Sequence, residues 1–429
     1  MEKSNCTKPS TFGFIPNDWS ESLWGDVLTT FTTGATPYRG IPAYYEGTEN
    51  WISSGELNGN KILKTKEHIS AEAIRDTNLK IHQPGTFLMA ITGLEAEGTR
   101  GKCGILGVPS TTNQSCLAIN STDKMSVEFV LHVYKALSDW YAFKYSQGTK
   151  QQSYKGDIVK GFPIIHPTSV AEQKAIAEIL DNTNSLIYNL EKVIAKKKRI
   201  KKGAMQELLT GKVRLRGFNE PWVELELGNI GKLTGAGVDK TINEEETPVR
   251  LLNFLDVYNR DRIYPHELTM RVTASDYKIS QCDIRKGDIF LTPSSELPDD
   301  IGRSAVAMAD IYDACYSYHI LRLRPAIELD LVYSAYMLKT SAYEEQVRFL
   351  SEGSGKRYVI SLRNFREIRI SIPSDIEEQH AIGQVIATMD NEISALEAER
   401  DKYISIKQGM MQKLLTGQIR LPQSCLKEE

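Results

Sequence analysis

The densest group of charged side chains is the basic run at residues 196–202, where every position except Ile200 is Lys or Arg. Such a run can contact phosphates or an acidic partner. It can equally be the solvated face of a helix, and the sequence leaves both interpretations open. A matching segment later in the chain replaces most of this charge with Ser405, Ile406 and Gln408. A phosphate contact made symmetrically by both segments is therefore not expected.

Enzyme motifs are the second kind of chemistry to test. The sequence contains no P-loop, G-x-G-x-x-G turn, H-E-x-x-H motif or G-x-S-x-G turn, and no proline-rich loop of an adenine methyltransferase. Asp299 and Asp300 resemble the start of a nuclease carboxylate cluster, but no Glu-x-Lys or Asp-x-Lys follows them. We interpret them as a loop with carboxylates and expect a binding protein without catalytic residues.

Composition sets further limits. The six cysteines form no C-x-x-C pair and the seven histidines never fall at metal-ligand spacing, so no metal site is expected. Residues 1–10 lack a secretory signal and no long apolar run exists, which predicts reduced thiols, no membrane span and a cytoplasmic location. The net charge of −3 argues against a generally basic nucleic-acid binder but permits a local basic surface. A length of 429 residues fits two or three domains.

The elements that must position these residues come in two copies. Residues 167–215 reappear as residues 373–421, at a constant offset of 206 and without a gap. Both copies begin with Pro and end in Leu-Leu-Thr-Gly-x-(Val/Ile)-Arg-Leu. A second, shorter repeat lies at the start of each unit and aligns Trp19 with Trp222. Two copies imply pseudo-twofold symmetry inside one chain, and a partner or target that also has two halves.

Each copy is predicted to be one long helix. Ser169 and Glu172 form a capping box at its start, and Asp375 and Glu378 stand at the same places in the second copy. The closing Leu-Leu-Thr-Gly supplies a glycine that can take the left-handed conformation of a helix end. Between these signals lie roughly 40 residues, or a helix of about 60 Å.

An apolar stripe at coiled-coil spacing follows both predicted helices, so each needs a partner. We expect the two to pack antiparallel on each other, and a long helix lying on its own globular domain is the alternative. The residues predicted to pack along this spacer are Ile176, Leu186, Leu190, Ile200, Leu208, Ile382, Met389, Leu396, Tyr403 and Leu414.

Residues 20–166 and 223–372 are predicted to be mixed α+β domains, because short apolar runs alternate with Gly and Pro. Helices are expected over residues 127–144 and 331–349. The two domains align only loosely, whereas the helices are nearly copied. One interpretation is a common scaffold that presents two different readers. The other is that the sequences of loop-rich domains have drifted apart.

This tandem architecture resembles the DNA specificity subunit of type I restriction–modification systems, and the resemblance covers nearly the whole chain. It rests on two variable domains, each followed by the long helix that ends in Leu-Leu-Thr-Gly-x-(Val/Ile)-Arg-Leu. The shortened junction at residues 218–222 departs from the lead-in at residues 12–19, which affects only the domain boundary.

The resemblance implies two target recognition domains joined by two conserved spacer helices, each domain reading half of a split, asymmetric site in double-stranded DNA. The subunit itself would be non-catalytic and bind no cofactor. It would recruit two methyltransferase (M) subunits that modify adenine with S-adenosylmethionine. With restriction (R) subunits, the complex would cleave unmodified DNA using ATP and Mg.

Candidate DNA contacts are polar residues beside glycines in predicted loops. There Lys and Arg can approach phosphates, Arg can bind guanine O6 and N7 with two hydrogen bonds, and Ser, Asn or Gln can bond base edges. A solvated surface side chain is the alternative at each position. The candidates are Ser53, Lys102, Lys150, Gln151, Gln152, Asn253, Arg303, Lys356 and Arg357.

The predicted fold class is α+β: two similar mixed α/β target recognition domains, separated by two long antiparallel helices that form a coiled-coil spacer, with a pseudo-twofold internal repeat. Residues 1–166 and 218–372 are the expected recognition domains, residues 167–217 the first spacer helix, and residues 373–429 the second helix with a C-terminal tail. The predicted function is DNA sequence recognition within a type I complex. A structural adaptor whose paired helices hold two protein-binding domains is the alternative, and a stand-alone hydrolase is a third interpretation.

Overall fold

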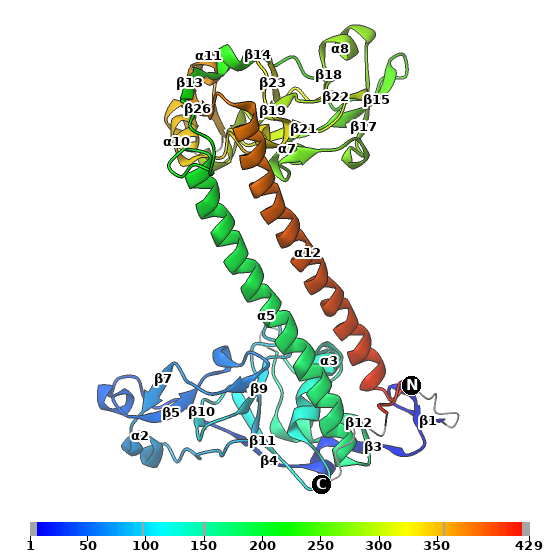
Figure 1. Cartoon of the computed structure of the whole chain (residues 1–429). Helices are drawn as coiled ribbons and strands as arrows, with labels where there is room; N and C mark the ends of the chain where they lie inside the picture. Colours follow the sequence, from blue (N-terminus) through cyan, green and yellow to red (C-terminus); the bar gives the residue numbers. More distant parts are fainter. Residues whose placement is uncertain (1–6, 97, 149–151, 355–356, 423–429) are drawn as a thin grey trace. The chain divides into compact units, whose positions relative to one another are not determined.

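The chain divides into two compact units, each made of one globular domain and parts of both long helices. The computed structural model describes residues 7–96, 98–148, 152–354 and 357–422. Unit 1 comprises residues 1–190 and 399–429, and unit 2 comprises residues 191–398. The long helices, α5 (Val170–Leu208) and α12 (Ile376–Leu414), each contribute to both units (Figure 1).

Unit 1 is built on a five-stranded sheet with strand order β4-β11-β8-β9-β6, accompanied by the sheet β10-β5-β7 and the pairs β1-β2 and β12-β3. The strands are β1 (Thr7–Ser10), β2 (Gly13–Pro16), β3 (Trp19–Leu23), β4 (Leu28–Thr33), β5 (Glu49–Ile52), β6 (Lys61–Ile62), β7 (Glu67–Ile69), β8 (Phe87–Ala90), β9 (Cys103–Leu106), β10 (Thr111–Thr112), β11 (Cys116–Ser121) and β12 (Pro163–Pro167). The helices are α1 (Trp24–Val27), η1 (Pro42–Tyr45), η2 (Ser54–Glu56), α2 (Ala71–Asp76), α3 (Val127–Tyr145) and α4 (Gly156–Lys160).

Aromatic side chains form the centre of the unit 1 core. Trp24 is fully buried and meets the ring of Phe162 edge-on, with 5.6 Å between centroids. The hydroxyl of Tyr141 on α3 donates to the carbonyl of Pro163, 2.7 Å away, at the start of β12, the strand that precedes α5. Ile176 and Leu180 of α5 join the same core. Burial of this large apolar surface fixes the start of the long helix on its domain.

Unit 2 repeats this plan with its own five-stranded sheet, order β14-β23-β19-β21-β16, and with the sheets β17-β15-β22-β18, β20-β25-β24 and β13-β26. The strands are β13 (Trp222–Glu226), β14 (Gly231–Thr234), β15 (Thr247–Leu252), β16 (Arg262–Ile263), β17 (Arg271–Ala274), β18 (Asp283–Ile284), β19 (Ile289–Leu291), β20 (Ser294–Ser295), β21 (Ser304–Ala307), β22 (Ile311–Tyr316), β23 (Leu321–Pro325), β24 (Glu352–Ser354), β25 (Arg357–Val359) and β26 (Arg369–Pro373). The helices are α6 (Leu227–Ile230), α7 (Phe254–Tyr258), η3 (Pro265–Glu267), α8 (Asp276–Gln281), η4 (Pro298–Asp300), α9 (Leu331–Ser334), α10 (Ser341–Leu350) and α11 (Leu362–Glu367).

The predicted relationship between the two domains is confirmed by their five-stranded sheets and by the strand pair that precedes each long helix. Trp19 pairs with Pro167 in unit 1, and Trp222 pairs with Pro373 in unit 2. A Cβ added at Gly228 would lie 3.2 Å from the Cβ of Arg366, and the equivalent glycine of unit 1 has a contact of the same kind. The fold class predicted from the sequence therefore holds, including the internal repeat.

Residues 331–349 differ from the prediction of a single helix. They form α9 and α10, whereas α3 in unit 1 is continuous. The hydroxyl of Thr340 accepts from the backbone N–H of Tyr343 at 3.2 Å and so caps a new helix. The side chain of Gln206, from α5, donates to the carbonyl of Lys339 and accepts from the N–H of Ser341. These hydrogen bonds satisfy the backbone groups that the break exposes.

Both long helices begin and end as the sequence predicts. The Ser169 hydroxyl accepts from the N–H of Glu172 at 3.4 Å, and Gly211 and Gly417 close the helices with the same φ of +69°. The carboxylates of the predicted capping boxes have another role. Both oxygens of Glu172 accept from Arg420 at 2.6 Å, and Glu378 receives Arg214 in the same way at 2.6 and 2.7 Å.

Within each unit, the parts of α5 and α12 run antiparallel. In unit 2, Lys197 pairs with Glu392 at 2.6 Å, Lys198 with Glu397 at 2.7 Å, and Lys201 with Asp390. Of these three pairs, the one nearest the C-terminal end of α5, Lys201 with Asp390, is also the one nearest the N-terminal end of α12, as antiparallel helices require. Half of the cations in the basic run at residues 196–202 are used in this way to join the two helices of unit 2.

The ten residues predicted to pack along the helices fall into three groups. Those at the helix ends are buried in the domain cores, and Leu190 is buried in mid-helix: Ile176, Leu190, Leu208, Ile382 and Leu414. Met389, Leu396 and Tyr403 are half-buried. Leu186 is 38% exposed and Ile200 is 49% exposed.

The exposure of Leu186 and Ile200 has a simple cause. In the first copy the covered positions fall one residue later, at Ile187, Ile194 and Lys201. Two adjacent apolar residues stand at 186–187 and at 193–194, so periodicity alone cannot say which member of each pair faces the protein.

Candidate nucleic-acid interface

In unit 2, a small sheet joins two loops that are far apart in the sequence. Strand β25 pairs with both β20 and β24, so Ser294 and Ser295 lie beside residues 358–359. The Arg357 guanidinium donates to the hydroxyl of Ser294, 3.2 Å away. Arg357 is exposed, and its remaining donors can therefore reach a ligand.

A second backbone contact in unit 2 places Tyr318 and His319 near Lys240. The N–H of Tyr318 donates to the carbonyl of Val238 at 3.2 Å. This approach requires Gly237, because an added Cβ would lie 2.1 Å from the Tyr318 nitrogen. Lys240 consequently comes near His319, and the rings of Tyr318 and His319 lie against each other with 3.8 Å between centroids.

The electrostatics of this group decide its protonation. Partial burial lowers the pKa of His319, and the neighbouring cations Lys240 and Arg357 lower it further, while Asp239 opposes them. His319 is therefore neutral at neutral pH, with one ring nitrogen donating and one accepting. We call Lys240, Tyr318, His319 and Arg357 the unit 2 reader. Its cations can bind phosphates or guanine, and its rings can contact base edges.

The same place in unit 1 carries different chemistry. The N–H of Asn113 donates to the carbonyl of Ile52, and Ser317 makes the same bond to Leu252 in unit 2, both at 2.9 Å. Gln114 therefore occupies the position of Tyr318. Its amide oxygen accepts from the hydroxyl of Thr36 at 2.6 Å.

Another loop of unit 1 carries a second amide, that of Gln152. The backbone of Gln152 bonds Leu94 and Glu95, which ties residues 94–95 to the loop near residue 152. We call Thr36, Gln114 and Gln152 the unit 1 reader. Amides and hydroxyls of this kind suit adenine and other base edges.

Two of the predicted DNA contacts are helix caps. The carbonyl of Ser53, at the start of η2, accepts from the N–H of Glu56 at 3.0 Å, and the N–H and hydroxyl of Ser53 donate to the Glu56 carboxylate at 3.1 and 3.2 Å. Asn253 accepts from the N–H of Phe254 at 2.7 Å and its N–H donates to Asp256. Both residues occupy the same place in their domains, directly after β5 and β15. Their side chains hold the backbone locally and are not part of either reader.

The remaining candidates divide between loops and residues that are not described. Lys102 and Arg303 each follow a glycine with positive φ, +73° at Gly101 and +75° at Gly302. The Arg303 side chain is 45% exposed and lies 3.8 Å from Asp300. Gln152 and Arg357 belong to the readers. Lys150, Gln151 and Lys356 lie outside the described residues.

Sequence reasoning missed Thr36, Gln114, Lys240, Tyr318 and His319. The only signal for them is a glycine shortly after the strand that opens each sheet. Gly34 lets its loop approach Thr112, whose carbonyl oxygen would lie 1.7 Å from an added Cβ, and Gly237 acts likewise in unit 2. The glycines can be read from the sequence, but the residues they bring together cannot.

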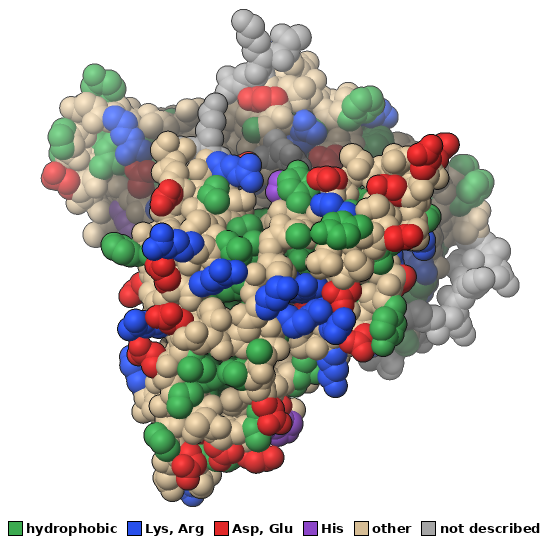
Figure 2. All heavy atoms as spheres, turned by 90° about the horizontal axis from the view of Figure 1, so that it is seen from above, with side chains coloured by type: hydrophobic (Ala, Val, Ile, Leu, Met, Phe, Trp, Pro, Cys, Tyr) green, Lys and Arg blue, Asp and Glu red, His purple; other side chains and the backbone are tan. Residues whose placement is uncertain are grey.

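One face of the molecule is electrostatically mixed. Figure 2 shows Lys and Arg side chains interspersed with Asp and Glu over the face it views, without one continuous basic field. Among the described residues, no group of three or more His, Cys, Asp or Glu side chains is placed to hold a metal ion. No helix within the described ranges is long and apolar enough to cross a bilayer.

A groove on the helix pair is the second candidate surface of unit 2. It encloses about 460 Å³ between α5 and α12, and Ile200, Val385 and Met389 provide its apolar lining. Beyond it, Gly203 stands near the C-terminal end of α5 with open space where a side chain would be, as Gly409 does near the C-terminal end of α12 in unit 1. A helix-interior glycine costs about 1 kcal/mol relative to alanine, and nothing within either unit explains these two.

Comparisons with known proteins agree with the repeat. The family model described as the type I restriction modification DNA specificity domain matches the chain twice, over residues 16–202 and 219–405. The chain is 23% identical to the type I restriction enzyme MjaVIII specificity subunit of Methanocaldococcus jannaschii, with 95% of this chain and 94% of that protein covered. It is 25% identical to the putative MjaX specificity subunit of the same organism, covering 98% of each.

A solved structure has the same fold. It is the S subunit of the type I restriction-modification system from M. genitalium, matched at 14% identity with a TM-score of 0.56 over 96% of this chain and 99% of that one. A second structure, described in work on complex assembly and conformational transition of the type I R-M system, matches at 17% identity with a TM-score of 0.55, over 94% and 99%.

Proposed function

Because the chain belongs to the family of the type I restriction modification DNA specificity domain, we propose that it reads DNA sequence for a type I restriction–modification complex. The observation that carries this proposal is the pair of readers. They stand at equivalent places in the two domains, and one offers amides and hydroxyls while the other offers cations and rings. Two different readers in one chain suit a bipartite, asymmetric site.

The long helices act as the spacer between the half-sites. Each is a single helix of 39 residues with the same start and stop signals. A continuous helix is stiff over this length, so it can fix the separation of two DNA-binding surfaces and thereby the number of unread base pairs between half-sites.

Lengthening the spacer tests this function. One heptad is inserted into each helix, between Leu190 and Lys196 and between Leu396 and Lys402, which keeps the phase of the apolar positions. Seven residues add about 10 Å, or about three base pairs. We expect N6-methyladenine mapping in cells to show the same bases read across a longer gap. Methylation at the original spacing would show that the helices are not the spacer.

The partners would be methyltransferase subunits that dock helices on the groove of α5 and α12. Ile200 and Val193 are 49% and 44% exposed on α5, and apolar side chains at such spacing suit a helix laid in a groove. The open glycines Gly203 and Gly409 would permit close backbone approach. The partner subunits would supply S-adenosylmethionine for methylation and, with restriction subunits, ATP and Mg for cleavage. The chain itself would remain non-catalytic and act in the cytoplasm.

A charge placed in the groove tests the docking. Ile200→Glu with Met389→Glu should weaken association with the methyltransferase subunit at least tenfold, because each buries a carboxylate without a partner. Ile242→Glu is the matched control, since Ile242 is 77% exposed and outside the groove. Equal association of all three proteins, measured by analytical ultracentrifugation, would exclude this surface.

A further inference from the structure

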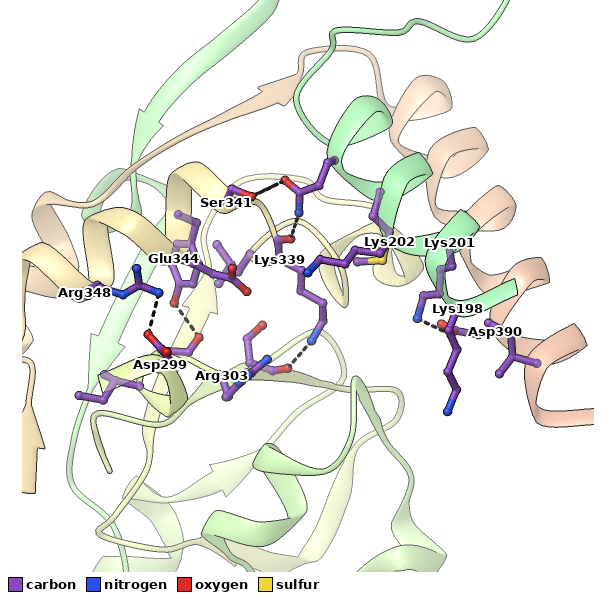
Figure 3. A pocket seen from close by; sticks show the side chains of 18 of the residues that line it. Lys198, Lys201, Lys202, Asp299, Arg303, Lys339, Ser341, Glu344, Arg348 and Asp390 are labelled. Atoms are coloured by element: carbon purple, nitrogen blue, oxygen red, sulfur yellow. Dashed lines mark hydrogen bonds and ion pairs between the residues drawn. The ribbon is translucent and has the colours of Figure 1, made fainter. Parts of the chain in front are cut away.

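A cavity of unit 2, with a volume of about 710 Å³, lies where the two long helices meet the globular domain. Figure 3 shows its walls: α5 contributes Lys198 and Lys202, α10 contributes Glu344 and Arg348, and Arg303 comes from the loop after η4. These side chains come from separate segments of the chain, so only the folded unit brings them together.

The cations of the cavity differ in how firmly they are held. Lys201 and Lys339 are only 18% and 20% exposed, and each pairs with a carboxylate, Asp390 and Asp261 respectively. Such half-buried pairs are part of the fold. These two lysines are therefore not available to a ligand.

Four other cations are free to change partners. Lys198 pairs with Glu397 and Arg348 with Asp299, but both cations are more than half exposed, and exposed pairs contribute only about 0–1 kcal/mol. Arg303 lies 3.8 Å from Asp300. Lys202 points into the cavity and makes no ion pair or hydrogen bond with the described residues.

The corresponding place in unit 1 has no such character. A cavity of about 330 Å³ lies there between the last turns of α12 and α3, lined mainly by apolar side chains such as Val133, Leu137 and Met411. At the offset of 206, Lys198 and Lys202 become Ile404 and Gln408. The basic lining is thus a property of unit 2 alone and not a consequence of the shared fold.

We propose that this cavity binds phosphate groups of the DNA backbone, with Lys202 and Arg303 as the principal contacts and Lys198 and Arg348 as exchangeable ones. The assignment rests on the proposed function. Arg303 ends the segment whose other end, Ser294, bonds Arg357 of the unit 2 reader, so one segment connects the cavity with the base-reading group. Asp299 and Glu344 face the same space, and they limit the site to a few phosphates and prevent general polyanion binding.

Backbone contacts position a protein on DNA without reading its sequence. The cavity should therefore hold the strand beside the half-site of unit 2 and contribute equally to all sequences. Because unit 1 has Ile404 and Gln408 in place of Lys198 and Lys202, the anchoring is stronger in unit 2.

The test measures the salt dependence of DNA binding by the full chain in complex with its methyltransferase subunits. The variants are Lys202→Ala with Arg303→Ala, Lys202→Arg, and the control Lys232→Ala, an exposed lysine on β14 outside the cavity. The probes are a duplex with the mapped recognition site, a duplex without it, and inorganic tripolyphosphate.

For the double variant we expect the slope of log K against log salt to fall by about 2, since each lost phosphate contact removes about 0.9. Affinity for both duplexes should fall by the same factor, the methylated sequence should not change, and Lys202→Arg and Lys232→Ala should behave as the wild type. Thermal melting confirms that the double variant is folded.

Three outcomes would overturn the assignment. They are an unchanged slope, a loss confined to the recognition-site duplex, and loss of tripolyphosphate binding with DNA binding intact, which would identify a free phosphate ligand instead. A wild-type complex without any sequence preference would instead refute the proposed function. The slope measured on non-specific DNA would still decide whether the cavity binds phosphates.

Discussion

The two junctions where a long helix returns to a globular domain are nearly identical, whereas the two readers follow equivalent strands and carry different side chains. Gly211 and Gly417 end the helices with the same φ, and Arg214 and Arg420 bind buried carboxylates at the same 2.6 Å. In the readers, Gln114 of unit 1 stands where unit 2 has Tyr318.

The difference shows which parts of the molecule carry a geometric requirement. A helix must leave each domain at a defined angle, and that angle depends on a few buried contacts, so their residues are the same in both copies. The readers are loops held by strand pairing and by glycines, and strand pairing uses backbone atoms alone. Their side chains can therefore differ without disturbing the fold.

The junction ion pairs offer the strongest test, because Glu378 and Glu172 have side chains that are 0% and 6% exposed. Arg214→Ala and Arg420→Ala should each lower the free energy of unfolding of their own unit by about 3–5 kcal/mol, since each leaves a buried carboxylate without its cation. Denaturant unfolding with hydrogen exchange resolved by unit measures this. Arg216→Ala, at an exposed position nearby, is the control. If either junction variant loses no more stability than this control, the two junctions are not equivalent.

Lys201 and Lys407 occupy the same position in the two helices and should respond with opposite signs. Lys201 pairs with Asp390, which also accepts from the hydroxyl of Tyr336 at 2.6 Å. Burial lowers the pKa of Lys407, as does the nearby Lys135, and Asp181 only partly compensates.

Lys201→Met should therefore destabilise unit 2 by about 1–3 kcal/mol, because Asp390 loses its cation. Lys407→Met should leave unit 1 unchanged or more stable, because a desolvated charge is removed. Thermal melts of the two variants decide the matter. Destabilisation by both would show that Lys407 is an equally well-paired group.

The smallest effect expected is a difference in pH response. Burial lowers the pKa of His166 in unit 1, so its contribution to stability is complete above the unfolded pKa near 6.5 and is lost as pH falls below it. Hydrogen bonding to Asp330 raises the pKa of His380 in unit 2. The contribution of His380 is present below pH 6.5 and is lost as pH rises through its folded pKa.

Acidification from about pH 7 to 5.5 should thus lower the melting temperature of unit 1 by a few degrees relative to unit 2. Hydrogen exchange as a function of pH measures both units in one sample. Burial also lowers the pKa of His82 in unit 1, so replacing His82 and His166 together with Asn should reduce the difference. A difference unchanged in this variant would assign the pH response to other groups.

Local and repeated signals explain what could be predicted. The ends of α5 and α12 are set by caps and glycines within a few residues of each boundary, and the repeat supplies each signal twice. Which face of α5 is buried cannot be predicted in the same way, because Leu186-Ile187 and Val193-Ile194 each offer two adjacent apolar residues for one inward position. Ser53 and Asn253 stay predicted DNA contacts, and the structure adds that both stand at the start of a helix. The sequence does not separate the two roles, because a hydroxyl or amide that caps a helix has the same chemistry as one that binds a base.

By itself, the sequence determined two long helices, two related mixed domains and the family, since all of these are recorded in local patterns and in their repetition. Only the tertiary structure decided which loops form the readers and which cations surround a cavity. Val238 meets Tyr318, and Ser294 meets Arg357, through pairings between distant strands. No local pattern encodes such pairings, because backbone hydrogen bonds between strands are the same for every side chain that the strands carry.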